Sequence, residues 1–300
     1  MNQLEAMRIF VRVAEQASFT RAAESLGLRK TSVSHAVQTL ENALGARLLH
    51  RTTRRVQLTQ DGQAYYERAR ELLAEFEELE TLFQRSAQAL RGRLRVDMPS
   101  AMARKHVLPH LPAFLAAHPH LELELSSTDR YVDVVREGFD CVVRAGTLDD
   151  SRLVARRLGV YRVVNCASPE YLERHGVPHL LEDLAHHQLI HYVSTLGARS
   201  PGFEYPHGHE YRTQPMPGVL TVNSADAYEH ACLAGLGIIQ APAPGVREYL
   251  QSGALVEILP QYRPEPMPVS IVYAHRRNLP RRVEAFMDWI ATTMHPHLAD

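Results

Sequence analysis

The sequence predicts a multi-domain protein in which a small winged helix-turn-helix, mostly helical, precedes a linker helix and a larger α/β domain. Three observations predict this fold class. Charge is segregated along the chain, apolar residues recur at helical spacing in the first 90 residues, and strand and helix patterns alternate after Gly92. A length of 300 residues corresponds to about two or three average domains. We therefore expect domain boundaries at residues 1–60, 61–90 and 91–300.

The composition is that of an ordinary globular protein, with 45% hydrophobic and 22% charged residues. No apolar run approaches the roughly 18 to 20 residues that span a bilayer, and the charged residues within the first twenty are unlike a signal peptide. We therefore expect no membrane partner. Three widely spaced cysteines cannot form a disulfide framework, which favours a reducing cytoplasm. They are Cys141, Cys166 and Cys232.

The formal net charge of −1, taken whole, argues against a nucleic-acid partner, but it conceals three differently charged segments. Residues 1–60 hold nine Lys and Arg against four Glu, a net charge of +5, and residues 61–90 hold seven acids against three Arg, a net charge of −4. The remaining 210 residues hold 21 basic and 23 acidic side chains, a net charge of −2. A basic head, an acidic middle and a near-neutral body indicate separate parts with separate roles.

Three helices are predicted in the basic head. The first spans about residues 3–16, the second is capped by Ser18 and ended by Gly27, and the third spans 29–44 and is closed by Gly45. Two short helices joined by a glycine-containing turn form a helix-turn-helix, whose second helix is sized to enter a major groove. Its apolar stripe is Val33, Ala36, Val37, Leu40 and Leu44, and its opposite, almost uncharged stripe is Thr31, Ser34, His35, Gln38 and Asn42.

Two short strands follow, at Leu48–Leu49 and around Val56 and Leu58, and the turn between them is rich in Arg and Thr. Guanidinium and hydroxyl groups in such a wing suit phosphate or minor-groove contacts. The alternative is a small helical domain with a solvated polar face. The wing, the positive charge and the uncharged helix face together favour double-stranded DNA as the partner. The predicted DNA contacts are Thr31, Ser32, Ser34, His35, Gln38, Arg51, Thr52, Thr53 and Arg54.

The head also resembles a known family. The runs AAESLGL (22–28) and TSVSHAVQTLENALGARLLHRTTRRVQLTQDG (31–62) resemble the N-terminal winged helix-turn-helix of LysR-type transcriptional regulators. Leu49 stands where many members have Phe, which conserves volume. The layout of the remaining chain is also similar. The resemblance implies a sequence-specific transcriptional regulator, modulated by a small-molecule effector and assembled as a homodimer or homotetramer.

Residues 61–90 lack Gly and Pro after Gly62, and Thr59 can cap the helix that they predict. Apolar residues recur at heptad spacing over about three heptads, and the intervening positions are dense in Glu and Arg. This pattern favours pairing with a second copy, which would place two recognition helices on a two-fold DNA site. The alternative is one amphipathic helix packed on its own domain. The predicted seam is Tyr65, Ala69, Leu72, Phe76, Leu79 and Phe83.

Strand and helix patterns alternate from Gly92 onward, which predicts an α/β domain with mostly parallel strands. The Pro-rich stretch 263–268 precedes a last strand and helix, so the chain is expected to cross back to an earlier subdomain. This layout resembles the two-lobed, periplasmic-binding-protein-like effector domain of the LysR family, with one lobe of 92–161 plus 269–300 and a second of 162–268. Helices are expected at 102–116, 131–137, 169–175, 225–234 and 280–294.

Ligands of open α/β sheets bind beyond the carboxyl ends of strands, often at helix N-termini. Polar residues at such positions are the predicted effector contacts, and family members place contacts at matching strand ends. Ser100 and nearby amides are expected to hold a carboxylate; each candidate has the alternative role of a helix cap, and Arg144 that of a salt-bridge partner. A small organic acid or an aromatic molecule is the favoured ligand. The candidates are Ser100, Ala101, Thr128, Arg144, Thr195, Asn223 and Ser224.

Other signals form no site. Seventeen histidines include no convergent set typical of a metal site, and GxSxG, Walker and GxGxxG motifs are absent, so we expect no metal, cofactor or catalysis. A free cysteine is most often an inert small hydrophobe, although a redox role of Cys166 or Cys232 stays open. Two rival functions remain: a solute-binding or catalytic unit with a protein-interaction head, and a constitutive repressor without an effector.

Overall fold

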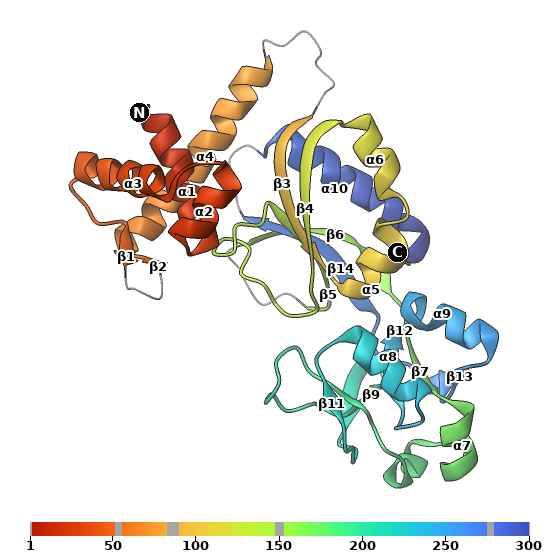
Figure 1. The fold of residues 1–300 in the computed structure, drawn as a ribbon. Coiled ribbons are helices and arrows are strands. Elements are labelled where there is room, and N and C mark those ends of the chain that lie inside the picture. Colours follow the sequence, from red (N-terminus) through yellow and green to blue (C-terminus); the bar gives the residue numbers. More distant parts are fainter. Residues whose placement is uncertain (1, 52–55, 83–89, 148–152, 275–278, 300) are drawn as a thin grey trace.

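The structure is a computed structural model that describes residues 2–51, 56–82, 90–147, 153–274 and 279–299 (Figure 1). An N-terminal head lies beside a five-stranded sheet, and a second α/β lobe lies beyond that sheet (Figure 1). The chain therefore has two internal contacts, one between the head and the first lobe and one between the two lobes. The predicted residues Thr52, Thr53, Phe83 and Arg54 lie outside the described residues.

The head contains three helices whose limits follow the predicted spacing. Ser18 caps the second helix, since its Oγ accepts the N–H of Arg21 at 3.3 Å. Gly27 and Gly45 end the second and third helices in the left-handed conformation, each with φ of +65°. The predicted helix-turn-helix is therefore present. The helices are α1 (Gln3–Gln16), α2 (Phe19–Leu26) and α3 (Lys30–Leu44).

The last residue of the predicted apolar stripe is not buried. Leu44 is 40% exposed, whereas the four preceding stripe residues of α3 are buried against the head core. Glu41 is buried in its place, and its Oε1 accepts the N–H groups of Leu48 at 2.9 Å and Leu49 at 3.1 Å. Because this carboxylate holds the chain that follows α3 beneath the helix end, Leu44 is left at the surface.

The wing and the linker helix follow directly. Strands β1 (Leu49–Arg51) and β2 (Val56–Leu58) pair antiparallel. Thr59 caps α4 (Gln60–Leu82), since its Oγ1 accepts the N–H of Gly62 at 2.9 Å. A Cβ atom at Gly62 would lie 1.9 Å from the carbonyl oxygen of Leu48, so only glycine lets the helix begin against the wing.

The predicted heptad seam of α4 is divided in this structure. Tyr66, Ala69 and Leu73 are buried in the head core, so one face of the helix packs on its own domain. This is the alternative that the sequence left open, and it includes the seam residue Ala69. Leu72, also in the seam, is 51% exposed. A second copy therefore has an apolar position available on α4 that the head does not cover.

Lobe I is the five-stranded sheet with the helices that cover it. Strand β3 lies between β4 and β5 and is parallel to both, whereas β14 lies between β5 and β6 and is antiparallel to both. Helices α6 and α10 pack on the sheet through a common buried core that includes Leu94, Phe114 and Phe286. The elements are β3 (Arg91–Met98), α6 (Leu111–Ala117), β4 (His120–Ser127), β5 (Cys141–Ala145), β6 (Leu153–Tyr161), β14 (Met267–Ala274) and α10 (Arg281–Met294).

Two helix predictions in lobe I are wrong. The expected helix 102–116 is interrupted, because Pro109 has no N–H to donate and its ring excludes a regular helix there. The expected helix 131–137 is a series of turns. Asp133 and Glu137 accept backbone N–H groups of their own loop through their side chains, which replaces helical hydrogen bonding. The first segment consists of α5 (Ser100–Met102), a π-helical turn (Ala103–Val107) and α6.

Lobe II contains a three-stranded sheet with β7 at its centre and β12 and β13 antiparallel to it. A parallel pair, β8 and β11, and an antiparallel hairpin, β9 and β10, complete its described strands. The elements are β7 (Val163–Ala167), α7 (Pro169–His175), β8 (His191–Tyr192), β9 (Phe203–His207), β10 (Glu210–Gln214), β11 (Thr221–Val222), α8 (Ala225–Leu233), β12 (Ile239–Pro242), α9 (Ala243–Ser252) and β13 (Val256–Glu257), with 3₁₀ turns at Leu181–His186 and Pro260–Tyr262. A further 3₁₀ turn, His295–His297, follows α10 and belongs to lobe I.

The prediction of mostly parallel strands is wrong. Within the described part of the two lobes, the named strands form three parallel and five antiparallel pairings. Two of the antiparallel pairings arise because the chain returns from lobe II and inserts β14 between β5 and β6, and the other three lie within lobe II. Strand β6 and the hairpin of β9 and β10 were not predicted.

Candidate DNA-reading surface and ligand cleft

Helix α3 lies on the side of the head away from the two lobes (Figure 1), and most of its residues that were predicted to meet DNA are exposed. Thr31, Ser32, His35 and Gln38 are exposed, and Ser34 is half-buried. The opposite face of α3 is fixed by the head core, which orients the polar face outward. Arg51 lies at the end of β1, next to the part of the wing that is not described.

A cleft of about 230 Å³ lies between lobe I and lobe II. Three predicted effector contacts line it, namely Ala101, Thr128 and Arg144. Polar and aromatic residues that the sequence did not single out line it as well. They are Lys105, His106, Asp129, Arg130, Tyr131, Tyr161, Tyr192, Ser194, Tyr228, Glu229 and Gln240.

Four predicted effector contacts lie outside the lining of this cleft. The Ser100 hydroxyl donates to the carbonyl oxygen of Ser127 at 3.2 Å. Thr195 and Asn223 are exposed, and Ser224 is the N-cap residue of α8. Ser194 lines the cleft where Thr195 was expected. Strand-end position therefore located the cleft but not each side chain that faces it.

Arg144 is held by a buried carboxylate in the wall of the cleft. Its Nη2 lies 2.7 Å from Oδ2 of Asp97, which is fully buried, and Thr128 donates its hydroxyl to Oδ1 of Asp97 at 3.1 Å. Arg144 is thus a salt-bridge partner, the alternative that the sequence left open. The charge of Arg144 is matched within lobe I.

Charged contacts join the two lobes across the cleft. Asp129, two residues after the end of β4, accepts the N–H of Ser100 through Oδ1 at 3.0 Å and the N–H of Ala225 through Oδ2 at 2.7 Å. Arg104 Nη2 lies 2.6 Å from Oδ1 of Asp226. These bonds connect the start of α5 in lobe I with the start of α8 in lobe II.

Lys105 forms a further link between the lobes. Its Nζ lies 3.3 Å from Oε2 of Glu229 and also donates to the carbonyl oxygen of Gly245. Burial raises the pKa of Glu229, and the neighbouring Lys105 charge opposes that rise. The ammonium group is therefore engaged by lobe II although Lys105 belongs to lobe I.

The cleft is also lined by aromatic side chains that are uncharged at neutral pH. The rings of Tyr192 and Tyr228 meet edge to face with centroids 5.5 Å apart. Burial raises the pKa of Tyr192 to about 12 and also raises the pKa of Tyr228. Burial, with His297 and Lys105 nearby, lowers the pKa of His106 to about 4. Each of these side chains is neutral near pH 7.

The signals for the missed residues were partly present in the sequence. Asp129 is adjacent to the predicted contact Thr128, and Tyr192 lies three residues before the predicted contact Thr195. Lys105 and Glu229 carried no local signal, because they meet only when the lobes come together.

Within the described residues, no group of three or more His, Cys, Asp or Glu side chains is suited to hold a metal ion. None of the described helices combines the length and apolar character needed to cross a membrane.

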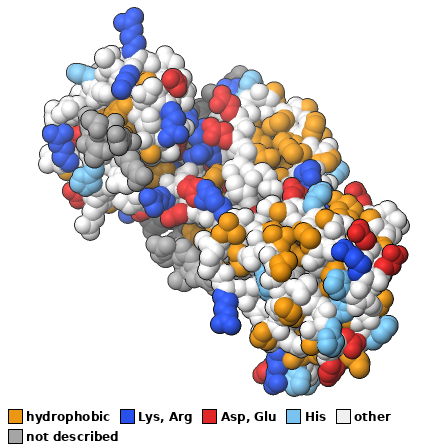
Figure 2. Space-filling model, turned by 60° about the horizontal axis from the view of Figure 1, so that its bottom comes forward, with side chains coloured by type: hydrophobic (Ala, Val, Ile, Leu, Met, Phe, Trp, Pro, Cys, Tyr) orange, Lys and Arg blue, Asp and Glu red, His pale blue; other side chains and the backbone are white. Residues whose placement is uncertain are grey.

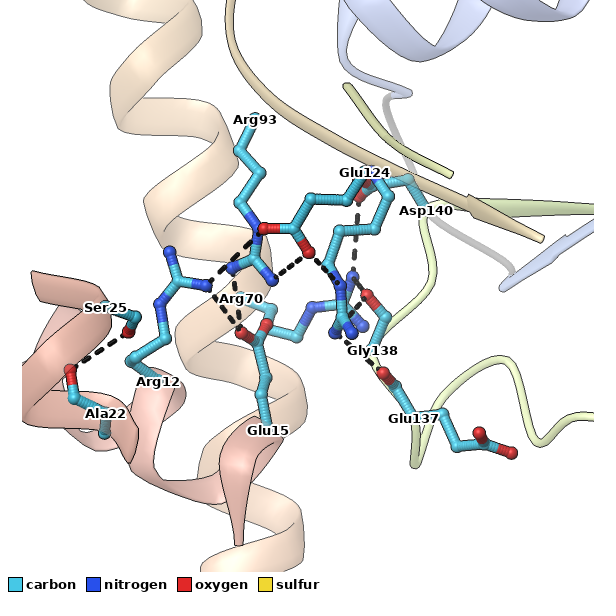
Figure 3. A network of polar contacts seen from close by, with 11 residues as sticks. Arg12, Glu15, Ala22, Ser25, Arg70, Arg93, Glu124, Glu137, Gly138 and Asp140 are labelled. Carbon is cyan, nitrogen blue, oxygen red and sulfur yellow. Dashed lines mark hydrogen bonds and ion pairs between the residues drawn. The ribbon is translucent and has the colours of Figure 1, made fainter. Parts of the chain in front are cut away.

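The contact between the head and lobe I is a second charged region. Figure 2 shows Lys, Arg, Asp and Glu side chains gathered where the head meets the α/β part, with hydrophobic side chains exposed beyond them. Glu15 at the end of α1 accepts from Arg93 of β3 at 3.0 Å, and Arg93 also donates to Glu124 of β4 at 2.8 Å (Figure 3). Arg70 of α4 lies 3.5 Å from Asp140 (Figure 3).

A winged helix-turn-helix head joined to two α/β lobes around a cleft defines a DNA-binding regulator with a ligand-binding domain. The chain belongs to the LysR family of bacterial transcriptional regulators. The family described as "LysR substrate binding domain" matches residues 87–295, and that described as "Bacterial regulatory helix-turn-helix protein, lysR family" matches residues 4–63. These matches confirm the predicted family and fold class.

Similar proteins support the same assignment. The chain is 48% identical to the HTH-type transcriptional regulator YhjC of Escherichia coli (strain K12), over 99% of this chain and 100% of that protein. It is 37% identical to an HTH-type transcriptional repressor of Pseudomonas aeruginosa (strain UCBPP-PA14), over 97% and 92%. The structure of CrgA, a LysR-type transcriptional regulator from Neisseria meningitidis, matches with a TM-score of 0.59 and 33% identity, over 96% of this chain and 97% of that one.

Proposed function

We propose that this regulator reads a two-fold DNA site with the polar face of α3 in each of two heads, and that a small molecule in the cleft between the lobes changes this reading. The observation that carries the proposal is the division of α3 into a buried apolar face and an exposed, uncharged polar face. Hydrogen-bonding side chains on such a face meet base edges in the major groove. The proposed base contacts are Thr31, Ser32, Ser34, His35 and Gln38, and the proposed backbone contacts are Arg51, Thr52, Thr53 and Arg54.

The proposed division of labour assigns residues 1–60 to DNA binding, 61–90 to dimerisation and 91–300 to effector binding. Within the last part, residues 92–161 plus 269–300 form one lobe and residues 162–268 the other. Separate buried cores in the head, in lobe I and in lobe II support this division. The exposed Leu72 on α4 supports pairing of two linker helices, and a tetramer would need a further contact.

The effector is proposed to lie among the cleft residues rather than at all the positions predicted from strand ends. Ala101, Thr128 and Arg144 line the cleft and remain candidates, together with Tyr192, Tyr228 and Gln240. An aromatic molecule fits walls of this composition. We further infer that the protein is cytoplasmic, because its free cysteines suit a reducing compartment. We also infer that it acts as a regulator without enzymatic activity, because both family matches are to domains of regulators.

The test of direct reading is Gln38→Ala on the exposed face of α3. We expect binding to the selected DNA site to weaken by about 1–3 kcal/mol, with a smaller loss on random DNA, since each base-edge contact discriminates by that amount. Competition gel-shift assays with both DNAs measure this difference. Gln251→Ala, an exposed glutamine of α9 in lobe II, is the matched control. An equal loss on both DNAs would contradict direct reading by Gln38.

A further inference from the structure

We propose that Asp129 sets the class of ligand that the cleft accepts: its carboxylate occupies the backbone amides at which an acidic ligand would dock, so the cleft takes an uncharged or cationic single-ring aromatic molecule and excludes a carboxylate. This inference rests on the proposed function of the cleft as the effector site. The sequence favoured a small organic acid or an aromatic molecule as the ligand, and this inference excludes the organic acid.

The carboxylate of Asp129 is bonded to both lobes. Its two oxygens accept one N–H each, from Ser100 in lobe I at 3.0 Å and from Ala225 in lobe II at 2.7 Å. Amides at the start of a helix such as the nine-residue α8 favour an anion, and a charge-assisted hydrogen bond is stronger than a neutral one. The protein itself therefore supplies the anion at the position where Ser100 and its neighbours were expected to hold a ligand carboxylate.

The cations that line the cleft are also engaged by carboxylates of the protein. Arg144 pairs with Asp97 at 2.7 Å, and Lys105 pairs with Glu229 at 3.3 Å. A ligand carboxylate would have to compete with these contacts while lying near Asp129 and Glu229, and like charges in a partly buried site repel.

Arg130 is engaged in the same way. Its two terminal nitrogens contact the two carboxylate oxygens of Glu137, at 2.9 Å for Nη1 and 2.5 Å for Nη2. This bidentate pairing uses the guanidinium edge that would otherwise grip a carboxylate ligand. Each Lys and Arg in the described lining of the cleft is therefore already paired with a carboxylate of the protein, which disfavours binding of an anionic ligand.

The remaining lining favours an aromatic ring. Tyr161 and Tyr228 are buried, Tyr131 and Tyr192 are more exposed, and Met102 and Met267 complete an apolar wall. Aromatic faces attract other rings and cationic groups, and thioether sulfur packs well on ring edges. An apolar cavity of roughly 150 Å³ holds benzene, so a cleft of about 230 Å³ has room for one ring with a short substituent.

The experiment compares benzoate, benzamide and benzylamine, which share a ring and differ in charge, on the full-length wild type and on Asp129→Ala. Thermal shift and calorimetry measure binding. We expect wild type to bind benzamide or benzylamine at least tenfold more tightly than benzoate, and Asp129→Ala to gain at least tenfold in affinity for benzoate. Acetate should likewise raise the melting temperature of Asp129→Ala and leave that of wild type unchanged, because it replaces the missing carboxylate.

Two further variants control this comparison. Asp129→Ser removes the carboxylate but keeps a small polar side chain, so it leaves room at the two amides and serves if Asp129→Ala does not fold. Glu122→Ala removes an exposed carboxylate from β4, outside the cleft lining, and should behave as wild type with every probe.

Three outcomes would overturn the proposal. They are binding of benzoate to wild type as tight as that of the other two rings, failure of both benzoate and acetate to stabilise the Asp129 variants, and absence of benzamide and benzylamine binding to wild type. Sequence-selective gel shifts by wild type report separately on the proposed function. If wild type gave no sequence-selective gel shift, the proposed DNA recognition would be refuted, and the results of the ligand titrations would stand unchanged.

Discussion

The two internal contacts of this chain both use ion pairs, but they use them differently. Between the head and lobe I, arginines and carboxylates face one another directly, and Glu15 is only 6% exposed while it contacts Arg93 (Figure 3). Between the lobes, ion pairs lie around an aromatic hollow. Matched charges thus position the head against lobe I in one contact, and in the other they surround the cleft whose ligand class we propose they restrict.

The largest expected effect comes from the wall of the cleft. Asp97→Ala leaves the Arg144 guanidinium buried without its carboxylate, which should lower the free energy of unfolding by about 3–5 kcal/mol. The single tryptophan, Trp289, stacks on Phe114 in lobe I with ring centroids 4.7 Å apart, so its fluorescence reports the unfolding of this lobe in urea. If Asp97→Ala lowered the free energy of unfolding by less than about 1 kcal/mol, the Asp97–Arg144 ion pair would not be important for the stability of lobe I.

A second expected effect separates the two contacts by pH. The pKa of His106 in the cleft is lowered to about 4 by burial, with His297, Lys105, Arg247 and His110 adding repulsion. The unfolded chain therefore takes up a proton below about pH 6.5 that the folded chain refuses, so stability falls as the pH drops from 6.5 to 4, by on the order of 3 kcal/mol. Urea unfolding of wild type and His106→Phe at several pH values measures this difference.

The variant His106→Phe keeps a ring at this position but cannot titrate, so it should lose less stability than wild type over the same interval. The head contact responds at lower pH. Arg93 and Arg95 hold the pKa of Glu124 below its usual value, against the opposing effect of burial, so its contribution is present above about pH 4.5 and is lost as the pH falls through the lowered pKa. If the stability of wild type and of His106→Phe depended equally on pH, titration of His106 would not be the cause of the loss of stability.

A smaller effect is expected at the head contact itself. Glu15→Gln keeps the shape of the side chain but removes the charge that Arg93 and Arg12 face, which should cost about 1–2 kcal/mol and loosen the head. Hydrogen exchange should rise at the end of α1 and along β3, with lobe II unchanged. Glu24→Gln, at an exposed position of α2, is the matched control. Exchange equal to that of the control would contradict a positioning role for Glu15.

The smallest effect is expected for an ion pair outside both contacts. Arg156 of β6 lies 2.6 Å from Asp288 of α10, with side chains 43% and 68% exposed. Because water screens such a pair, Asp288→Ala should change the free energy of unfolding by no more than about 0.5 kcal/mol. The tryptophan signal measures it under the conditions used for Asp97→Ala. A loss comparable to that of Asp97→Ala would show that burial does not separate these pairs.

Local spacing was sufficient to predict the head. Helix limits near Gln3, Ser18 and Gly45 followed from periodicity and capping, because these signals act within a few residues of one another. The same spacing could not decide which face of α4 the head would cover. Tyr65 and Tyr66 are equally apolar neighbours in sequence, and only packing against the head buries Tyr66 fully.

Prediction of the cleft was less complete. Strand ends pointed to Thr128 and Arg144 because backbone topology brings strand ends to one edge. Ser100 does not line the cleft, and its N–H donates to Asp129. That bond depends on the conformation of the loop after β4, where the sequence predicted a helix at 131–137. Lys105 and Glu229 are 124 positions apart in the sequence, beyond the reach of any local pattern.

The sequence by itself determined the family, the helices of the head and the segregation of charge, since each depends on residue identity at short spacing. Only the tertiary structure decided the antiparallel return of β14, the burial of Glu41 in place of Leu44, and the bond of Asp129 to both lobes. The physical reason is that these features depend on which distant groups satisfy one another's hydrogen bonds and charges, and that choice is made when the lobes and the head pack together.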